Sequence, residues 1–150
     1  MTLEQEVASV AAFAIREAGG PNPYYYRVPE EFHYPAIYFP APEIRTRGET
    51  FRTYAAQYVW YIDIHCVTTE EAHERARSVV HAVRRVRNRI PLLNTDGSDS
   101  GETLRTTDPT TVKVDNGVCQ VRLEWTSRRP YDEPEHTMAA SVIPMLGVKD

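Results

Sequence analysis

An alternating segment that leads directly into an amphipathic segment is the feature that most constrains this chain. From Thr68 to Ile90 apolar side chains recur at helical spacing, and Thr68 stands three residues before Glu71, as in a capping box. Between residues 54 and 67 the side chains alternate, which is typical of a β-strand with one buried face. The residues on that apolar face are Tyr58, Trp60, Ile62, Ile64 and Cys66. A sheet face and a helix stripe can cover one another, which indicates a compact α+β domain.

Length and composition predict a domain that folds on its own core. A chain of 150 residues can bury about 68–70% of its unfolded surface, so it needs neither a metal nor a disulfide to fold. Its net charge of −4 argues against non-specific binding to nucleic acid or to anionic membranes. No apolar run approaches the roughly 20 residues of a membrane span, and residues 1–5 lack the basic region of a secretory signal. We therefore expect a protein that stays in the cytoplasm, or in something assembled there.

A hairpin is expected over residues 111–127. Asn116 and Gly117 favour a two-residue type I′ turn, and apolar residues alternate on both sides of it. The apolar pairs in that register are Val114 with Cys119 and Val112 with Val121. Both strands then present apolar side chains to one side of the sheet.

The remaining elements complete the predicted fold. A helix is expected over residues 3–18, where Thr2 and Gln5 repeat the capping-box spacing, and a short strand over residues 36–39. The order α, β, β, α, β, β predicts a four-stranded, mainly antiparallel sheet with two helices packed on one face. We expect residues 1–136 to form this single domain, residues 137–150 a C-terminal tail, and residues 91–109 a flexible loop.

Two connecting segments have the composition of contact surfaces. Residues 21–35 are rich in proline and tyrosine, which favours packing or protein contact over ligand stacking. Residues 40–53 are too long and too polar for a tight hairpin, so we expect a protruding arm that orders against a neighbouring subunit. The charged residues of this arm are Arg45, Arg47, Glu49 and Arg52.

Residue chemistry alone predicts neither catalysis nor a bound cofactor. Cys66 and Cys119 lie on apolar strand faces, where we expect two reduced core residues. His65 and Cys66 are adjacent on a strand, so their side chains point to opposite faces and cannot form a nucleophile–base pair. Two Glu-x-x-His pairs begin at Glu70 and Glu133, but the second lies among prolines and does not suit a di-metal site in a helix bundle. We expect no metal, no cofactor and no enzymatic activity.

Polar residues outside the core leave three interpretations open. The second helix carries six arginines, including Arg84 and Arg85, spread over the whole arc outside the apolar stripe. We favour a solvated face or an intersubunit ion-pair surface; a nucleic-acid-binding accessory protein is the alternative, and salt-dependent DNA binding would identify it.

Asp63 and His65 share the non-core face of the long strand, which we expect to be a subunit contact or a lumen surface. A cleft with a third polar group beside them would instead indicate a small enzyme.

The order of these parts resembles the tail terminator (tail completion) proteins of long-tailed bacteriophages and prophages. The resemblance covers roughly residues 2–127: the short first helix, the strand of sequence YPAIYF at 34–39, the long charged loop, the strand at 58–67, the helix at 68–90 and the hairpin at 112–125. It is a resemblance of layout and includes no diagnostic motif. The tyrosine segment at 24–26 and the apolar stretch after residue 137 are additions to that layout.

This resemblance implies a structural virion protein. The implied assembly is a ring, commonly six-fold, at the head-proximal end of the tail tube, where it ends tube polymerisation and joins the tail to the head. The implied partners are other copies of the chain, the tail tube protein and the head–tail connector protein. A head–tail connector or neck protein is the structural alternative. The subunit or tube interface is expected to include Arg45, Arg47, Glu49, Arg52, Asp63, His65, Arg84 and Arg85.

Overall fold

The computed structural model describes residues 4–132, and in this range the chain forms two helices and eight strands. The bounds are α1 Gln5–Glu17, β1 Asn22–Tyr25, β2 Ala36–Phe39, β3 Glu43–Gly48, β4 Thr53–His65, α2 Thr69–Arg85, β5 Arg89–Leu93, β6 Asp99–Arg105, β7 Thr110–Asp115 and β8 Val118–Pro130. The predicted C-terminal tail at 137–150, Thr2 and the second Glu-x-x-His pair lie outside the described residues.

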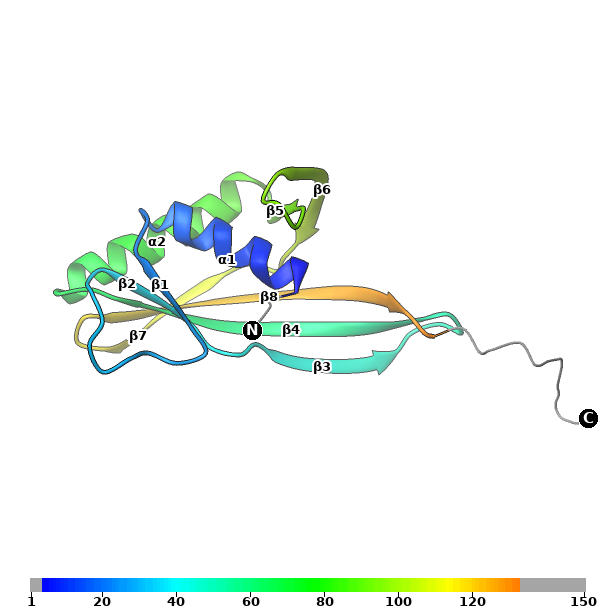
Figure 1. The fold of residues 1–150 in the computed structure, drawn as a ribbon, viewed down its shortest axis with the longest axis horizontal. Helices are drawn as coiled ribbons and strands as arrows, with labels where there is room; N and C mark the ends of the chain where they lie inside the picture. The colour runs from blue at the N-terminus through cyan, green and yellow to red at the C-terminus, as the bar shows by residue number, and fades with distance from the viewer. Residues whose placement is uncertain (1–3, 133–150) are drawn as a thin grey trace, which may run out of the picture.

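A six-stranded sheet forms one layer and the two helices form the other (Figure 1). The strand order is β1-β2-β4-β8-β7, and β3 pairs with the far end of β4. Both helices lie on the same face of this sheet, and the small β5–β6 sheet lies above that face beside α1. The predicted α+β class with two helices on one face is therefore confirmed, although the main sheet has six strands rather than four.

The two additional strands lie in segments that were predicted to be loops. β1 pairs in parallel with β2, with Asn22 opposite Ala36. β3 pairs antiparallel with the start of β4, with Gly48 opposite Tyr54, so most of the segment at 40–53 is part of a β-hairpin. All six residues of β3 are exposed. An exposed strand needs no apolar alternation, so this one gave no periodic signal.

The second helix ends earlier than the apolar stripe suggested. It stops at Arg85, and Arg87 and Asn88 follow with φ of 59° and 61°. The Asn88 backbone N–H donates to the Val83 carbonyl over 2.8 Å, which closes the helix end. Ile90 is fully buried, as predicted, but it lies in β5. Residues 91–109, predicted to be a flexible loop, contain most of the β5–β6 hairpin.

The β7–β8 hairpin is present, but its register differs by one residue from the prediction. Val112 pairs with Gln120, and Lys113 with Cys119. The register shifts between Lys113 and Asp115, as in a β-bulge. A one-residue slip moves side chains to the other face of a strand. Val112 and Val114 are accordingly 56% and 53% exposed, on the face opposite the helices.

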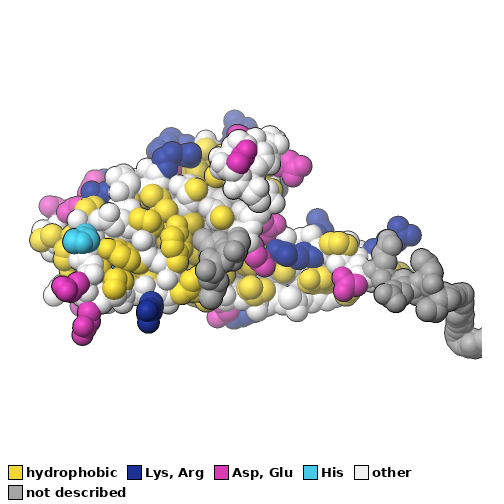
Figure 2. All heavy atoms as spheres, viewed as in Figure 1, with side chains coloured by type: hydrophobic (Ala, Val, Ile, Leu, Met, Phe, Trp, Pro, Cys, Tyr) yellow, Lys and Arg dark blue, Asp and Glu magenta, His cyan; other side chains and the backbone are white. Residues whose placement is uncertain are grey.

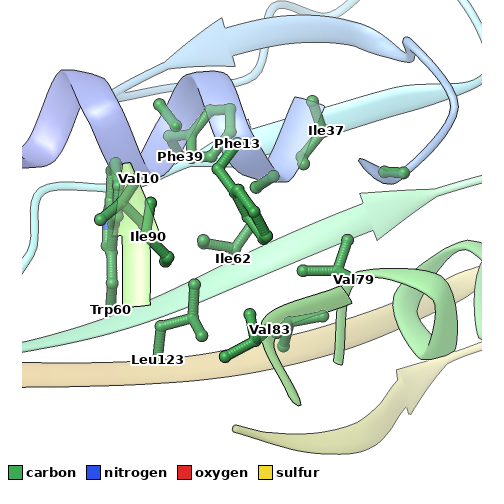
Figure 3. Close-up of a cluster of buried hydrophobic side chains, with 14 of the residues drawn as sticks. Val10, Phe13, Ile37, Phe39, Trp60, Ile62, Val79, Val83, Ile90 and Leu123 are labelled. Atoms are coloured by element: carbon green, nitrogen blue, oxygen red, sulfur yellow. The ribbon is translucent and has the colours of Figure 1, made fainter. Parts of the chain in front are cut away.

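The core lies between the helices and the sheet. Figure 3 shows Val10 and Phe13 of α1 and Val79 and Val83 of α2 pointing toward Ile62 and Leu123 of the sheet. The five apolar residues predicted for the inner face of the long strand are all buried. Cys66 and Cys119 are buried and free, as expected. Tyr58 stacks on Trp125 with a centroid distance of 5.1 Å, which extends the core toward β3.

One part of the sheet extends beyond the helices. β4 and β8 pair along their whole length, from Thr53 opposite Pro130 to His65 opposite Val118. Figure 1 shows that only one half of this long ladder is covered by α1 and α2, while the other half projects with β3. We call this projection the finger: residues 43–57 and 126–130. Its position at one end of the molecule sets the geometry of the candidate interface.

Candidate subunit interface

The tip of the finger is a hydrogen-bonded turn with an apolar residue at its apex. The Thr50 Oγ1 accepts hydrogen bonds from the backbone N–H groups of Arg52 (3.1 Å) and Thr53 (2.9 Å). The backbone N–H groups of Glu49 and Thr50 donate to the Thr53 carbonyl. Phe51 lies between these hydrogen-bonded residues, and its side chain is fully exposed. A hydrogen-bonded turn that presents an exposed phenyl ring suits contact with another macromolecule.

The finger is basic on the face that points away from the helices. Arg45 pairs with Gln57 across β3 and β4, and Arg47 pairs with Ala55. Because Arg128 lies opposite Ala55 in β8, the three arginines share that face. A hollow of about 140 Å³ on this face is lined by Arg45, Thr46, Arg47, Ala55, Gln57 and Thr126. Arg128 also binds Glu49 at the tip, with an N–O distance of 2.7 Å.

A polar network joins the other face of the finger to the start of α1. The Tyr58 hydroxyl donates to Glu4, and Arg129 donates to the Tyr58 oxygen over 2.7 Å. The Glu6 carboxylate accepts from Ser127. Burial, with the hydrogen bond to Glu4, raises the pKa of Tyr58 well above its usual range. This network fixes the base of the finger against the helix-covered body.

Asp63 and His65 lie at the opposite end of β4, roughly 40 Å from the finger tip at the rise of an extended strand. Asp63 accepts a hydrogen bond from the Gln120 amide over 3.0 Å, and burial raises the pKa of this carboxyl group. The ring of Phe32 covers His65 edge-on at 5.4 Å. Burial lowers the His65 pKa, and its Nε2 has no hydrogen-bond partner within residues 4–132.

Arg84 and Arg85 form a third group, at the end of α2. Arg84 binds Asp108, which also accepts a hydrogen bond from the Asn88 amide over 2.9 Å. These contacts hold the Asp108 pKa below its usual range. Arg85 approaches Glu17 of α1 at 3.9 Å. Both arginines therefore have an acidic partner inside their own subunit.

The eight residues predicted for the interface thus lie in three separate places. Only Arg45, Arg47, Glu49 and Arg52 come together, on the finger. Sequence reasoning missed Phe51, Arg128 and Arg129. The two arginines lie about 80 positions from the β3 hairpin, and only the full-length pairing of β4 with β8 brings them beside it.

Within residues 4–132 no three His, Cys, Asp or Glu side chains are grouped to hold a metal ion. In that same part of the chain, none of the helices is both long enough and apolar enough to span a membrane.

Comparison with known proteins places these features in a phage context. No family model matches the chain. The protein XkdJ of the phage-like element PBSX, from Bacillus subtilis (strain 168), is 26% identical over 147 residues, which is 98% of this chain and 100% of XkdJ. This chain is a relative of a phage-like element protein.

Two further similarities accompany it. The uncharacterized protein YqbJ of the same bacterium is 26% identical over 133 residues, which is 89% of this chain and 90% of YqbJ. A solved structure titled as the virion of a native gene transfer agent particle contains a chain with a TM-score of 0.47 and 14% identity. The match covers 83% of this chain and 94% of that one.

Proposed function

We propose that this chain is a structural protein of a phage or phage-like particle and acts as its tail terminator. Six copies form a ring at the head-proximal end of the tail tube, end tube polymerisation and join the tail to the head. The ring contacts the tail tube protein on one side and the head–tail connector protein on the other. It assembles in the host cytoplasm and remains in the virion.

The full-length similarity to the PBSX protein XkdJ carries this proposal. The shape of the subunit supports it. A ring built from head-to-tail contacts needs two different complementary surfaces on each subunit. The finger and the opposite end of β4 differ in chemistry and face in opposite directions, which meets that requirement.

The chemistry of the described residues favours a structural role over an enzymatic one. The polar group beside Asp63 is the Gln120 amide, which is not a nucleophile, and Phe32 covers His65. Burial raises the pKa of the Cys66 thiol to about 11, so this thiol is protonated near neutral pH.

The arginines of α2 favour ion pairs over a nucleic-acid face. Arg75 binds Glu71 at 3.1 Å and Arg77 binds Glu74 at 2.6 Å. Arg84 and Arg85 have the partners described above. Charges that are neutralised within the subunit contribute little to phosphate binding.

A tube-capping assay tests the proposal. Purified tail tube protein is polymerised with and without this chain, and tube lengths and ends are measured by electron microscopy. A terminator shortens the tubes and leaves an annulus at one end. Light scattering after size exclusion, over a concentration series, measures the mass of the free protein.

Unchanged tube growth together with binding to the connector would instead identify a neck protein. DNA binding that weakens steeply with salt would identify a nucleic-acid-binding accessory protein.

A further inference from the structure

We propose that the finger tip of each copy docks on the opposite end of the next copy, in a head-to-tail contact held by complementary charge and by Phe51. This inference rests on the proposed ring and identifies the surfaces that build it. The partner is a second copy of this chain.

The donor surface is the finger. Within residues 43–57 and 126–130 there are five arginines and two glutamates. Arg129 is paired with Glu4 outside the finger, and the other four arginines against the two glutamates leave a net charge of +2, although the whole chain carries −4. Two arginines of the outer face, Arg45 and Arg47, line the hollow described above. Phe51 projects from the tip, and its side chain is fully exposed.

The acceptor surface is the end of the molecule where β4 finishes and α2 begins. We call it the acidic end: residues 26–35, 66–74 and 113–117. Backbone contacts join its parts, because the Cys66 N–H donates to the Gly117 carbonyl and the Gly117 N–H donates to Thr69 Oγ1, both over 2.8 Å. Phe32, from residues 26–35, packs against His65 at the end of β4.

This end has the charge opposite to that of the finger. Its acidic side chains are Glu30, Glu31, Glu70, Glu71, Glu74 and Asp115, and its basic ones are Arg27 and Lys113. Glu71 and Glu74 are paired with Arg75 and Arg77, which lie just beyond it. The other four acidic side chains against the two basic ones leave a net charge of −2. Figure 2 shows acidic side chains at the left end of the molecule, opposite the finger, as well as elsewhere on this face. Exposed apolar side chains lie among them, as a site for Phe51 requires. They include Tyr34, Val67 and Val114.

The geometry makes this contact intermolecular. The two surfaces lie at opposite ends of the same β4–β8 ladder, so neither can reach the other within one subunit. After a single contact, the pair of copies keeps one free finger on one copy and one free acidic end on the other. Such contacts propagate from copy to copy, and they close into a ring when the rotation between copies permits.

Photo-crosslinking tests the contact directly. Phe51 is replaced by p-benzoylphenylalanine in the full chain, the protein is irradiated at concentrations where it self-associates, and the crosslinked peptides are identified by mass spectrometry. Mixing with isotope-labelled unmodified protein shows that the link joins two different chains. The matched control places the same group at Tyr61, an exposed residue in the middle of the sheet. Links from position 51 to the acidic end are expected, and links elsewhere or none would overturn the inference.

Charge reversal tests the electrostatic part. Arg47→Glu with Arg52→Glu, or Glu30→Arg with Glu31→Arg, is expected to weaken self-association at least tenfold in light scattering. The chain with all four changes is expected to recover most of that loss. Arg105→Glu, an exposed change in β6 and outside both surfaces, is the control. Reversed chains that associate like the wild type, or a closed dimer as the final species, would contradict the head-to-tail contact.

The two proposals fail in different ways. If the wild type caps tail tubes and crosslinks from position 51 map outside the acidic end, the terminator role stands and the docking model falls. If position 51 crosslinks to the acidic end while tubes grow unchanged, the docking model stands and the terminator role falls.

Discussion

The Ser127 hydroxyl donates a hydrogen bond to the Glu6 carboxylate over 2.8 Å, although the two residues lie 121 positions apart in the chain. The same carboxylate accepts from the Trp125 indole N–H over 3.2 Å. Glu6 lies in the first turn of α1, where a negative charge also complements the helix dipole. One acidic residue therefore joins the N-terminal helix to β8 at the base of the finger.

Loss of the Glu6 carboxylate should lower the stability of the fold. Replacing Glu6 with alanine leaves the buried Ser127 hydroxyl and Trp125 N–H without it, and we expect a loss of about 1–3 kcal/mol in the free energy of unfolding. Glu6→Gln keeps an acceptor and should cost less. Chemical denaturation measures both, with Glu102→Ala, an exposed change in β6, as the control. Equal stability of the Glu6→Ala and Glu102→Ala variants would show that the network contributes nothing.

The elements that the sequence predicted are those that bury a periodic face. The strand at 54–67 and the helix stripe after Thr68 each present one apolar side to the core, so their periods of two and of 3.6 are visible in the residues. β3 buries none of its six residues and carries no such pattern. The hairpin at 116–117 was found from its turn residues, but its register was not, because the β-bulge before Asp115 adds a residue that the turn alone does not reveal.

The candidate interface was predicted only in part for a related reason. Arg45, Arg47, Glu49 and Arg52 are neighbours in sequence, so their common surface could be inferred from composition. Arg128 joins them only through a ladder of 13 residue pairs, whose length depends on the tertiary structure. Phe51 is a single aromatic residue in a polar segment, and nothing in its sequence surroundings distinguishes an exposed ring from a buried one.

The observed register of β7 can be tested by substitution. Val112 is exposed, so Val112→Thr should change the free energy of unfolding by no more than about 0.5 kcal/mol. Leu123 is fully buried beneath the helices, and Leu123→Ala should cost about 2–5 kcal/mol. Urea titration of the two variants compares them. A large loss for Val112→Thr would favour the register in which Val112 faces Val121.

The start of α2 depends on a single capping side chain. Thr68 Oγ1 accepts a hydrogen bond from the Glu71 backbone N–H over 3.2 Å. This is the N-cap hydrogen bond of the predicted capping box. Thr68→Ala should lower the free energy of unfolding by about 0.5–2 kcal/mol, while Thr68→Ser should retain most of it. Thermal unfolding followed by circular dichroism measures the difference. A Thr68→Ala protein as stable as the serine variant would exclude a capping role.

The proposed docking between finger and acidic end predicts salt-sensitive assembly. The Debye length falls from about 10 Å at 0.1 M salt to about 3 Å at 1 M, so contacts between exposed charges are screened. We expect the dissociation constant for self-association to rise by about tenfold or more over that range. Phe51→Ala should weaken association at both salt concentrations, because burial of its ring does not depend on screening. Association that strengthens steadily with salt would indicate an apolar contact instead.

His65 should make the stability of the fold depend on pH. Because burial lowers its pKa in the folded state, the unfolded chain takes up the proton more readily. The folded state is therefore favoured at pH values above about 6.5, the usual histidine pKa, and loses stability as the pH falls through the lower folded-state value. His65→Gln removes this titration, so the stability difference between wild type and variant should move in favour of the variant from pH 7.5 to pH 5.5. Asp63, whose pKa is raised by burial, is present in both proteins. His81→Gln, an exposed change on α2, should keep the wild-type pH dependence, and a His65→Gln protein with that same dependence would contradict the assignment.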